Sequence, residues 1–558
     1  MPEPTFWWPL ELSAREKQAV EGMRADLLRQ SPQLDVAAVE RVSEQLALQM
    51  AHSLPAIVER DGLPHLCHVF NGWGDGLFRG RPLTAELEPF VHRNRSGGPI
   101  LLQCDPEGDY HPWQSLAYAV MAGVEPHKAL FEDAIGGVTL SQLAANSRFL
   151  RTDKGIELGH LLFAAAQLGG EALEGVFSLD GEEHDLSSLV DLAIEAHHFG
   201  GFDVCRKFHL TEGICAVAAL VPGFEGFRSQ GQGFLSGQLE MLLLLGVILQ
   251  QARRLLDTGR SLAEESPESR LVRELRDTLI VDEYLENHCY YAGHLIELAG
   301  FAEAMGYPIE AEHRGAMALV LNELNALLPE ALAELSFLDC FLHLGHYRRA
   351  MTLQLEVTRA QRGNRRLERA DLRRFEVDFD ALAAQPGLER SSVPPALFSS
   401  GIYAAAPPSV TIRPRFEAIV EHYAVRARQG LGPRGHLGHF RRIGPAAWPR
   451  AVHYELLDYG DRVGAEIHLE SDAVRPLGPV LRDLTAAVGE QFRSQTVEWE
   501  PGWSRNRGRL RVLFEENSPA EEVAEAMVAL VDKTLPTLEG QGGGLWGGSA
   551  VGEDALSR

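Results

Sequence analysis

Side chains that exchange protons recur just before or at the start of the helices predicted in the first 300 residues. Carboxyl groups can act as general acids or bases, and histidine titrates near neutral pH, so such residues suit acid–base catalysis. The candidate catalytic residues are Asp109, His111, Glu183, His184, Asp185, His209, Glu212, Glu286, His288 and His294. His209 and Glu212 are three apart, so we expect them to share one helix face and one water-accessible cavity with His294.

Aromatic residues accompany these groups. Tyr110, Trp113, Tyr290 and Tyr291 offer flat surfaces on which sugars or other rings can pack, and they are the predicted substrate-binding residues. The leading hypothesis is an enzyme that acts on a polar small-molecule or oligomeric substrate. Hydrolysis, elimination and epimerisation are all compatible with these residues. The structural alternative is that side chains such as Glu183 and Asp185 cap helix N-termini.

A zinc site is an alternative use of some of these residues. Cys205, His209, Cys289 and His294 supply thiolate and imidazole, the donors that zinc prefers, although the chain has no CxxC or HExxH motif. A Cys and His zinc site inside a helical toroid resembles that of the helical lanthionine-forming cyclases. Their Cys-His-Gly tripeptide is absent here. The leading hypothesis assigns no metal and no identified cofactor, and a zinc-dependent cyclase-like enzyme is the second alternative.

The elements that must position these residues are predicted to be helical hairpins. From about 110 to 355, a polar opening, an Ala- and Leu-rich run and a Gly or Pro recur. His111, His160 and His209 follow one another at 49-residue intervals, as do His294 and His343, and this length fits two helices with their connections. Hairpins of this kind bury their apolar faces by stacking. We predict a mostly α fold whose core is a closed (α/α) toroid, with an open solenoid as the alternative, and at least four helical histidines among positions 111, 160, 184, 209, 294 and 343.

The C-terminal part alternates apolar and polar residues. Segments 451–459 and 462–470 flank Gly460-Asp461 and predict an antiparallel hairpin, extended by strands near 497 and 511. Helices are expected at 474–491 and after Ser518, which gives a small α+β domain of order ββαββα. The strand period places Val463, Ala465 and Ile467 on one face, and Arg462, Gly464, Glu466 and His468 on the other.

These patterns divide the chain into five parts. They are an N-terminal helical region with a Gly- and aromatic-rich loop or short strands at 68–82 (1–95), the toroid-like domain (96–384), a Pro-, Gly- and Arg-rich arm or linker (385–448), the α+β domain (449–540) and a flexible Gly-rich tail (541–558).

Charge and hydropathy exclude several functional classes. The net charge of −26 over 558 residues repels phosphate backbones, so we do not expect nucleic-acid binding. The apolar run Met241 to Leu249 is shorter than the ~20 residues that span a membrane, and the N-terminus has no secretory pattern. We therefore expect a cytoplasmic protein with reduced cysteines. The hypothesis from another class is a non-catalytic scaffold or sensor that binds a protein partner through a concave helical surface and its C-terminal domain or tail; a homo-oligomer is compatible with either.

Overall fold

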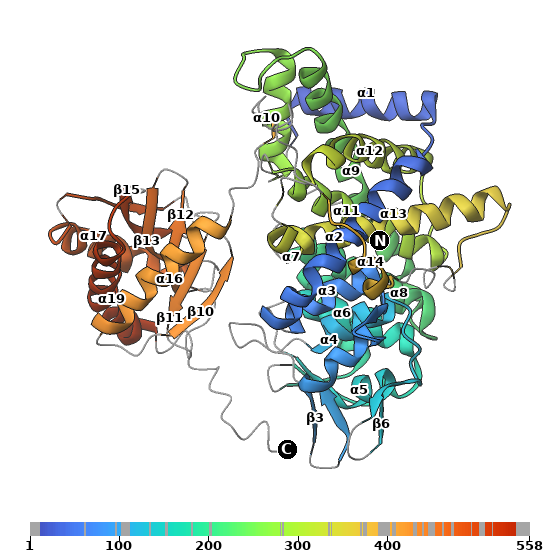
Figure 1. Ribbon diagram of the computed structural model, residues 1–558, viewed down its shortest axis with the longest axis horizontal. Helices are drawn as coiled ribbons and strands as arrows, with labels where there is room; N and C mark the ends of the chain where they lie inside the picture. The colour runs from blue at the N-terminus through green and yellow to red at the C-terminus, as the bar shows by residue number, and fades with distance from the viewer. Residues whose placement is uncertain are drawn as a thin grey trace. The chain divides into compact units, whose positions relative to one another are not determined.

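The chain divides into two compact units in the computed structural model (Figure 1). The helical unit comprises Met1–Asp105 and Asp109–Ala406, and the sheet unit comprises Pro106–Gly108 and Pro407–Arg558. The finer five-part division stays a prediction. The structure describes residues 12–60, 63–94, 97–101, 112–132, 136–150, 155–179, 182–199, 204–279, 281, 284–332, 335, 337–368, 371, 377–388, 402–403, 409–427, 432–437, 440–444, 452–459, 462–469, 474–492, 494–501, 508–515 and 517–542.

The protein is mostly helical, with an antiparallel sheet near the C-terminus. The helices of the helical unit are α1 (Ala14–Gln30), α2 (Val36–Arg60), α3 (Leu63–Trp73), α4 (Pro112–Met121), α5 (Leu140–Asn146), α6 (Gly155–Leu168), α7 (Leu186–Phe199), α8 (Val204–Leu220), α9 (Arg228–Asp257), α10 (Pro267–Leu279), α11 (Leu285–Ala304), α12 (Ala311–Ala331), α13 (Phe337–Arg362) and α14 (Phe379–Ala383). Its short strands are β1 (Leu77–Phe78), β2 (Arg81–Pro82), β3 (Val91–Arg93), β4 (Pro99–Leu101), β5 (Ala129–Glu132), β6 (Gly137–Thr139), β7 (Phe149–Leu150), β8 (Phe177–Leu179) and β9 (Glu182–His184).

Helices α3, α4, α6, α8, α11 and α13 pack in that order, and α13 packs back against α3. These helices therefore form a closed cycle of neighbours, which we call the inner cycle. Other helices pack outside it: α7 contacts α6 and α8, α9 contacts α8 and α11, and α2 contacts α13 and α3. The 49-residue interval corresponds to one inner helix and one outer helix, because α7 lies between α6 and α8 in the chain, and α12 lies between α11 and α13.

Glycines let the inner helices approach closely. A Cβ atom on Gly159 of α6 would lie 2.4 Å from the carbonyl carbon of His209 in α8. A Cβ on Gly293 of α11 would lie 2.5 Å from the backbone nitrogen of Tyr347 in α13. Real Cβ atoms do not come this near to backbone, so these contacts require glycine. Because each glycine precedes a histidine, the closest helix contacts also bring imidazoles together.

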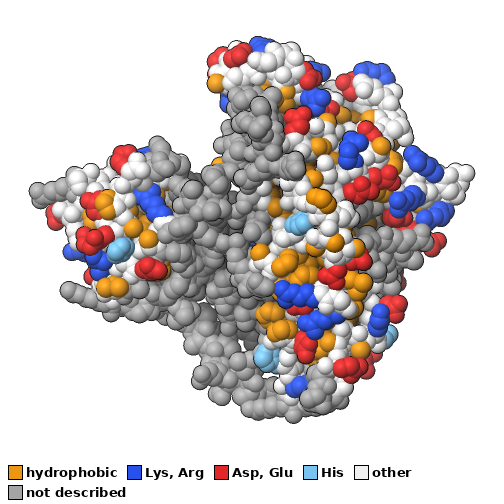
Figure 2. Space-filling view, viewed as in Figure 1, with side chains coloured by type: hydrophobic (Ala, Val, Ile, Leu, Met, Phe, Trp, Pro, Cys, Tyr) orange, Lys and Arg blue, Asp and Glu red, His pale blue; other side chains and the backbone are white. Residues whose placement is uncertain are grey.

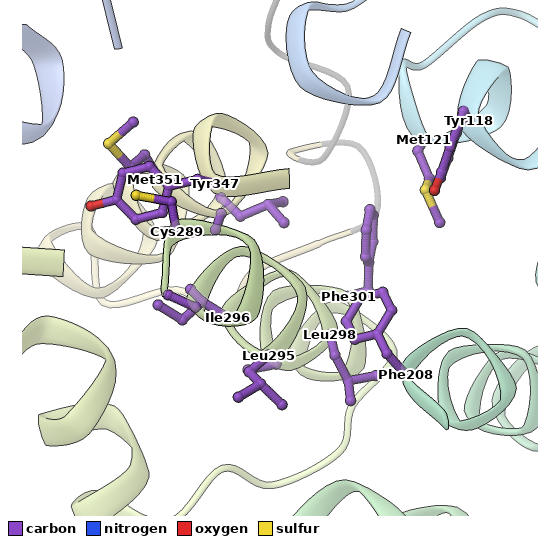
Figure 3. Packing of buried hydrophobic residues seen from close by; sticks show 14 of the residues in the cluster. Tyr118, Met121, Phe208, Cys289, Leu295, Ile296, Leu298, Phe301, Tyr347 and Met351 are labelled. Atoms are coloured by element: carbon purple, nitrogen blue, oxygen red, sulfur yellow. The ribbon is translucent and has the colours of Figure 1, made fainter. Parts of the chain in front are cut away.

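Helix α9 contains the apolar run. By length and composition alone, Glu225–Asp257 could cross a membrane, yet 67% of its most apolar window is buried inside the protein. That burial is typical of a core helix. Figure 3 shows similar all-round packing for α11, whose Leu295, Leu298 and Phe301 point in different directions.

The sheet unit is built on six antiparallel strands in the order β10-β11-β12-β13-β15-β14. Its strands are β10 (Gly432–Leu437), β11 (Phe440–Gly444), β12 (Val452–Asp458), β13 (Arg462–Leu469), β14 (Thr496–Glu500) and β15 (Arg509–Glu515), and its helices are α16 (Ser409–Arg426), α17 (Gly478–Gly489) and α19 (Ala520–Gly542). The predicted hairpin is confirmed as β12 and β13, and β15 and β14 extend it. Val463, Ala465 and Ile467 join the apolar core with residues of all three helices.

Two segments differ from the sequence predictions. The predicted irregular arm contains α16, β10 and β11, because its Gly- and Pro-rich residues form the edge of the sheet, where such residues are tolerated. The segment 68–82, predicted as a loop or short strands, begins inside α3, so His68 and Asn71 are helical, whereas its later part does form the short strands β1 and β2. The histidine prediction is confirmed, since His160, His209, His294 and His343 lie in helices. His184 ends β9, and His111 lies outside the described residues.

Replacing Gly159 with Ala is expected to lower the free energy of unfolding by roughly 1–3 kcal/mol, because the new methyl group overlaps the backbone of α8. Gly237→Ala in α9 is the matched control, since a Cβ there meets nothing within 4 Å. That variant should be neutral or more stable by about 0.5–1 kcal/mol. Urea unfolding of both variants measures the difference. Equal stabilities would contradict the close-packing interpretation.

Candidate functional site

Polar side chains from every inner helix meet in the centre of the cycle. Ring centroids lie 5.1 Å apart for Tyr118 and His68, 5.1 Å for Tyr118 and His160, and 4.0 Å for His160 and His209. The series continues to α11 and α13, with 5.6 Å between His209 and His294. We call this set the polar cluster: His68 and Asn71 (α3), Tyr118 (α4), His160 (α6), His209 and Glu212 (α8), Tyr290, His294 and Glu297 (α11), and His343, His346 and Arg349 (α13).

Two histidine–glutamate pairs orient their imidazoles in the same way. Nδ1 of His209 lies 3.2 Å from Oε2 of Glu212, and Nδ1 of His346 lies 2.8 Å from Oε2 of Glu297. The Nε2 atoms of both histidines face the hydroxyl of Tyr118, at 3.4 Å and 3.3 Å. A carboxylate on Nδ1 with Nε2 directed inward is the arrangement that holds metal-binding histidines in place.

His294 completes this pattern. Its Nδ1 lies 3.0 Å from the backbone oxygen of Tyr290, one turn earlier in α11. Its ring stacks on His346 with 3.8 Å between centroids. Nε2 of His294 is buried, and no described group lies within hydrogen-bonding distance of it. The imidazoles of His209, His294 and His346 therefore each have a partner on Nδ1, and Nε2 lies on the opposite side of the ring.

One thiol joins two of these imidazoles. The ligand atoms of Cys205, His209 and His294 all lie within 4.8 Å of one another. Cys205 is one turn before His209 on α8 and is partly exposed, whereas both histidines are fully buried. A thiolate and two imidazoles form a three-ligand set suited to zinc, with one coordination position left open.

Burial keeps most of this cluster uncharged. Desolvation raises the pKa of Glu297 to about 8 and lowers the pKa of its partner His346 to about 3. The same cause raises the pKa of Glu212 and lowers that of His209, which the neighbouring imidazoles lower further. Arg349, with a pKa lowered to about 9 by burial, stays charged at neutral pH. Neutral imidazoles are the form that binds metal ions.

The structure brings His209, Glu212, His294 and Tyr290 together among the residues singled out from the sequence. His209 and Glu212 share one helix face, as predicted. The sequence also predicted a water-accessible cavity, whereas His209, Glu212 and His294 have no exposed surface. Glu212 is the one predicted acid that the described structure places in the cluster.

The other predicted residues have different surroundings. Asp185 caps α7 by accepting a hydrogen bond from the Ser188 backbone at 2.8 Å, and Glu183 and His184 lie on the adjoining strand β9. Asp185 therefore follows the capping alternative, whereas Glu183 and His184 are strand residues, and Glu183 and Asp185 are exposed to solvent. Asp109, Tyr110 and His111 lie outside the described residues.

Several buried candidates pack elsewhere. The ring of Trp113 packs on Phe177 at 6.2 Å, and the Tyr291 hydroxyl donates to the backbone oxygen of Leu279. The ring of His288 lies 5.3 Å from that of Tyr403.

Glu286 and Cys289 are also buried. Desolvation, together with the charge of Glu286, raises the pKa of the Cys289 thiol. Cys289 packs beside Tyr347 and Met351, on the opposite side of α11 from Tyr118 in Figure 3, so it is not part of the three-ligand set.

Two thirds of the cluster was not predicted from the sequence to belong to the site. His160 and His343 were noted only for their spacing, and the other members not predicted as site residues are His68, Asn71, Tyr118, Glu297, His346 and Arg349. Gly-His dipeptides at 159–160, 293–294 and 345–346 mark three inner helices, and they could have drawn attention to His160 and His346. The interval from Glu297 to His346 is again 49 residues. Tyr118 carries no comparable pattern.

Comparison of the chain with known protein families, with curated proteins and with solved structures finds no match. The visible surface is chemically mixed: acidic and basic side chains alternate over the described parts of each unit in Figure 2. The polar cluster is therefore the feature of the described structure that indicates a function.

Glu297→Gln is expected to change how stability depends on pH. A carboxyl whose folded pKa is raised to about 8 stabilises the fold below its unfolded value near 4.5, and this contribution is lost as the pH rises to 8. The neutral amide removes this loss. Between pH 5 and pH 8, the free energy of unfolding of the variant should therefore rise, relative to that of wild type, by on the order of a few kcal/mol. Urea unfolding at both values measures the gain, with exposed Glu44→Gln as the control. A constant difference across this range would show that Glu297 ionises normally.

Proposed function

We propose that the helical unit is a metal-dependent enzyme whose centre is held by Cys205, His209 and His294. The observation that carries this proposal is the convergence of their ligand atoms within 4.8 Å. Zinc is the metal that best suits one thiolate and two imidazoles. Three protein ligands leave a position for water or substrate, which is typical of catalytic rather than structural zinc sites.

The surroundings of the ligands support a metal more than a purely structural cluster. Burying polar groups costs free energy unless partners compensate for lost hydration. His209 has Glu212 on Nδ1, and His294 has a backbone oxygen on Nδ1, so each ring is held with Nε2 on its other side, where the Tyr118 hydroxyl lies 3.4 Å from Nε2 of His209. Partners of this kind fix the tautomer and orientation of metal-binding histidines.

The cluster also contains groups able to move protons beside the proposed centre. Glu297 holds a proton near neutral pH because its pKa is about 8, and it contacts His346, whose ring stacks on His294. Bound zinc supplies a Lewis acid and lowers the pKa of a bound water. Glu297 and His346 would then transfer protons, and Arg349 would stabilise negative charge. A metal centre with these proton-transferring groups is suited to hydrolysis, elimination or epimerisation of a polar small-molecule or oligomeric substrate.

We also propose that the helical unit is an (α/α) toroid and that the protein works in a reducing compartment. The inner cycle, with α2, α7 and α9 outside it, supports an (α/α) toroid whose centre is filled by the polar cluster. Partly exposed Cys205 marks the end of α8 from which metal and substrate would enter. A thiolate ligand must stay reduced, so we propose a reducing compartment such as the cytoplasm.

Substitution of Cys205 tests the metal centre directly. The full-length protein is stripped with chelator, reloaded with Co²⁺ or Zn²⁺ and passed through a desalting column. We expect a thiolate-to-cobalt charge-transfer band in the near ultraviolet. Cys205→Ser should abolish this band and weaken Zn²⁺ binding by about 100-fold or more, while Glu212→Gln, which acts through His209, should weaken it by roughly 10–100-fold.

The matched control is His52→Ala, because His52 is an exposed histidine on α2 outside the cluster. It should bind metal like wild type. Circular dichroism confirms that each variant is folded, and Cys205→Ser is the least disruptive change since the thiol is partly exposed. Absence of the charge-transfer band in wild type, or its persistence in Cys205→Ser, would overturn the proposal and favour the scaffold hypothesis.

A further inference from the structure

The sheet unit contains a second group of ligand-type side chains, independent of the helical unit. His453 and Glu455 lie two residues apart on β12, and His468 pairs directly with His453 on β13. Because side chains alternate along a strand, these three residues project from one face of the sheet. One ligand atom from each lies within 4.8 Å of the other two.

We propose that His453, Glu455 and His468 bind a divalent first-row transition metal such as zinc. Both oxygens of the Glu455 carboxylate face an imidazole: Oε2 lies 3.2 Å from Nε2 of His453, and Oε1 lies 3.7 Å from Nδ1 of His468. Ligands around a tetrahedral zinc are about 3.3 Å apart when each metal–ligand distance is 2.0–2.1 Å. The two spacings to Glu455 are close to that value, and the ligand nitrogens of the two imidazoles lie within 4.8 Å of each other.

A supporting carboxylate orients His468. Nε2 of His468 lies 2.7 Å from Oε2 of Glu466, which leaves Nδ1 directed at Glu455. Glu466 is in turn held by the Arg509 guanidinium at 3.0 Å and by the Tyr459 hydroxyl. A carboxylate that fixes the second nitrogen of a histidine is the usual neighbour of a metal ligand.

The register of four strands builds this arrangement. One row of paired residues runs across the sheet as His453, His468, Arg509 and Glu500, and the next runs as Glu455, Glu466, Arg511 and Glu498. Arg509 and Arg511 pair with Glu500 and Glu498 on β14. Cations from β15 therefore lie beside the carboxylates of β13 and β14, while Glu455 of β12 lies beside two imidazoles and is the register partner of Arg442 on β11.

Burial distinguishes this group from a surface ion-pair network. His453, Glu455, Glu466 and His468 are each at most 4% exposed. Buried carboxylates and imidazoles need partners in place of water, and a divalent cation bound to Glu455 would be such a partner. Two imidazoles and one carboxylate make up a three-ligand set that occurs in catalytic zinc and non-haem iron sites, so this centre also has open coordination positions.

Cobalt spectroscopy separates this site from the thiolate site of the helical unit. The full-length protein is titrated with Co²⁺ and then with Zn²⁺, and bound metal is measured after desalting. This second site should give visible d–d bands without a thiolate charge-transfer band. Glu455→Gln and His453→Asn should each remove one equivalent of Co²⁺ and weaken Zn²⁺ binding by about 100-fold or more, and Glu466→Gln by roughly 10–100-fold.

His422→Ala is the matched control, because His422 belongs to α16 of the same unit and contacts Arg426. It should retain the full metal content. Glu455→Gln keeps the shape of the side chain, and His453→Asn provides a second test should the first variant not fold. Unchanged metal content and spectra in either variant, once circular dichroism shows it to be folded, would overturn this proposal. Loss of the charge-transfer band in Cys205→Ser alone bears on the helical unit and leaves this site unaffected.

Discussion

The close approach of paired inner helices is the constraint on which the helical unit depends. Gly159 places the backbone of α6 against that of α8 at His209, and Gly293 does the same for α11 and α13 at His346 and Tyr347. A larger residue at either position would push the helices apart. Imidazoles from neighbouring helices could then no longer lie with ring centroids 3.8–4.0 Å apart, as His160 with His209 and His294 with His346 now do. Packing and polar chemistry are thus set by the same few backbone contacts.

This arrangement has an electrostatic consequence. The cluster places several titratable groups where water is excluded. Burying the charged forms of such groups costs free energy, so they are mainly neutral or share a proton with a neighbour. Glu297 keeps its proton, and His346 gives up its own. In the sheet unit, the cost of burying carboxylates is offset by ion pairs, since Arg509 and Arg511 place positive charges beside neighbouring glutamates. The two units therefore stabilise buried carboxyl groups by different means.

Local patterns predicted the elements well but located the site only in part. The 49-residue interval and the Ala- and Leu-rich runs identified helices because these features depend on periodicity within one segment. The alternation in 451–470 similarly gave the hairpin and its faces. Residues such as Tyr118 and Glu297 could not be found this way, since their importance arises from helices distant in sequence. Conversely, Asp185 has a residue type that suits catalysis, yet the same carboxylate serves as an ordinary helix cap.

The hairpin illustrates what a pattern conceals. His453, Glu455, Glu466 and His468 occupy the polar positions of two alternating strands, and polar positions are ordinarily read as solvent-facing. Their burial could not be inferred from period two, because alternation distinguishes the faces of a sheet without showing what covers each one. The pairing of β12 with β13 places the H-x-E pattern of His453 and Glu455 beside the E-x-H pattern of Glu466 and His468.

Closure of the inner cycle also bears on how the protein is made. Asn71 of α3 contacts His346 of α13 across 275 residues, so the first and last inner helices complete each other. A nascent chain emerging from the ribosome must expose the polar faces of α3, α4 and α6 until α13 has been synthesised. Contacts with such large sequence separation form late and slowly. The centre is thus assembled only after α13, and with it most of the chain, has been translated.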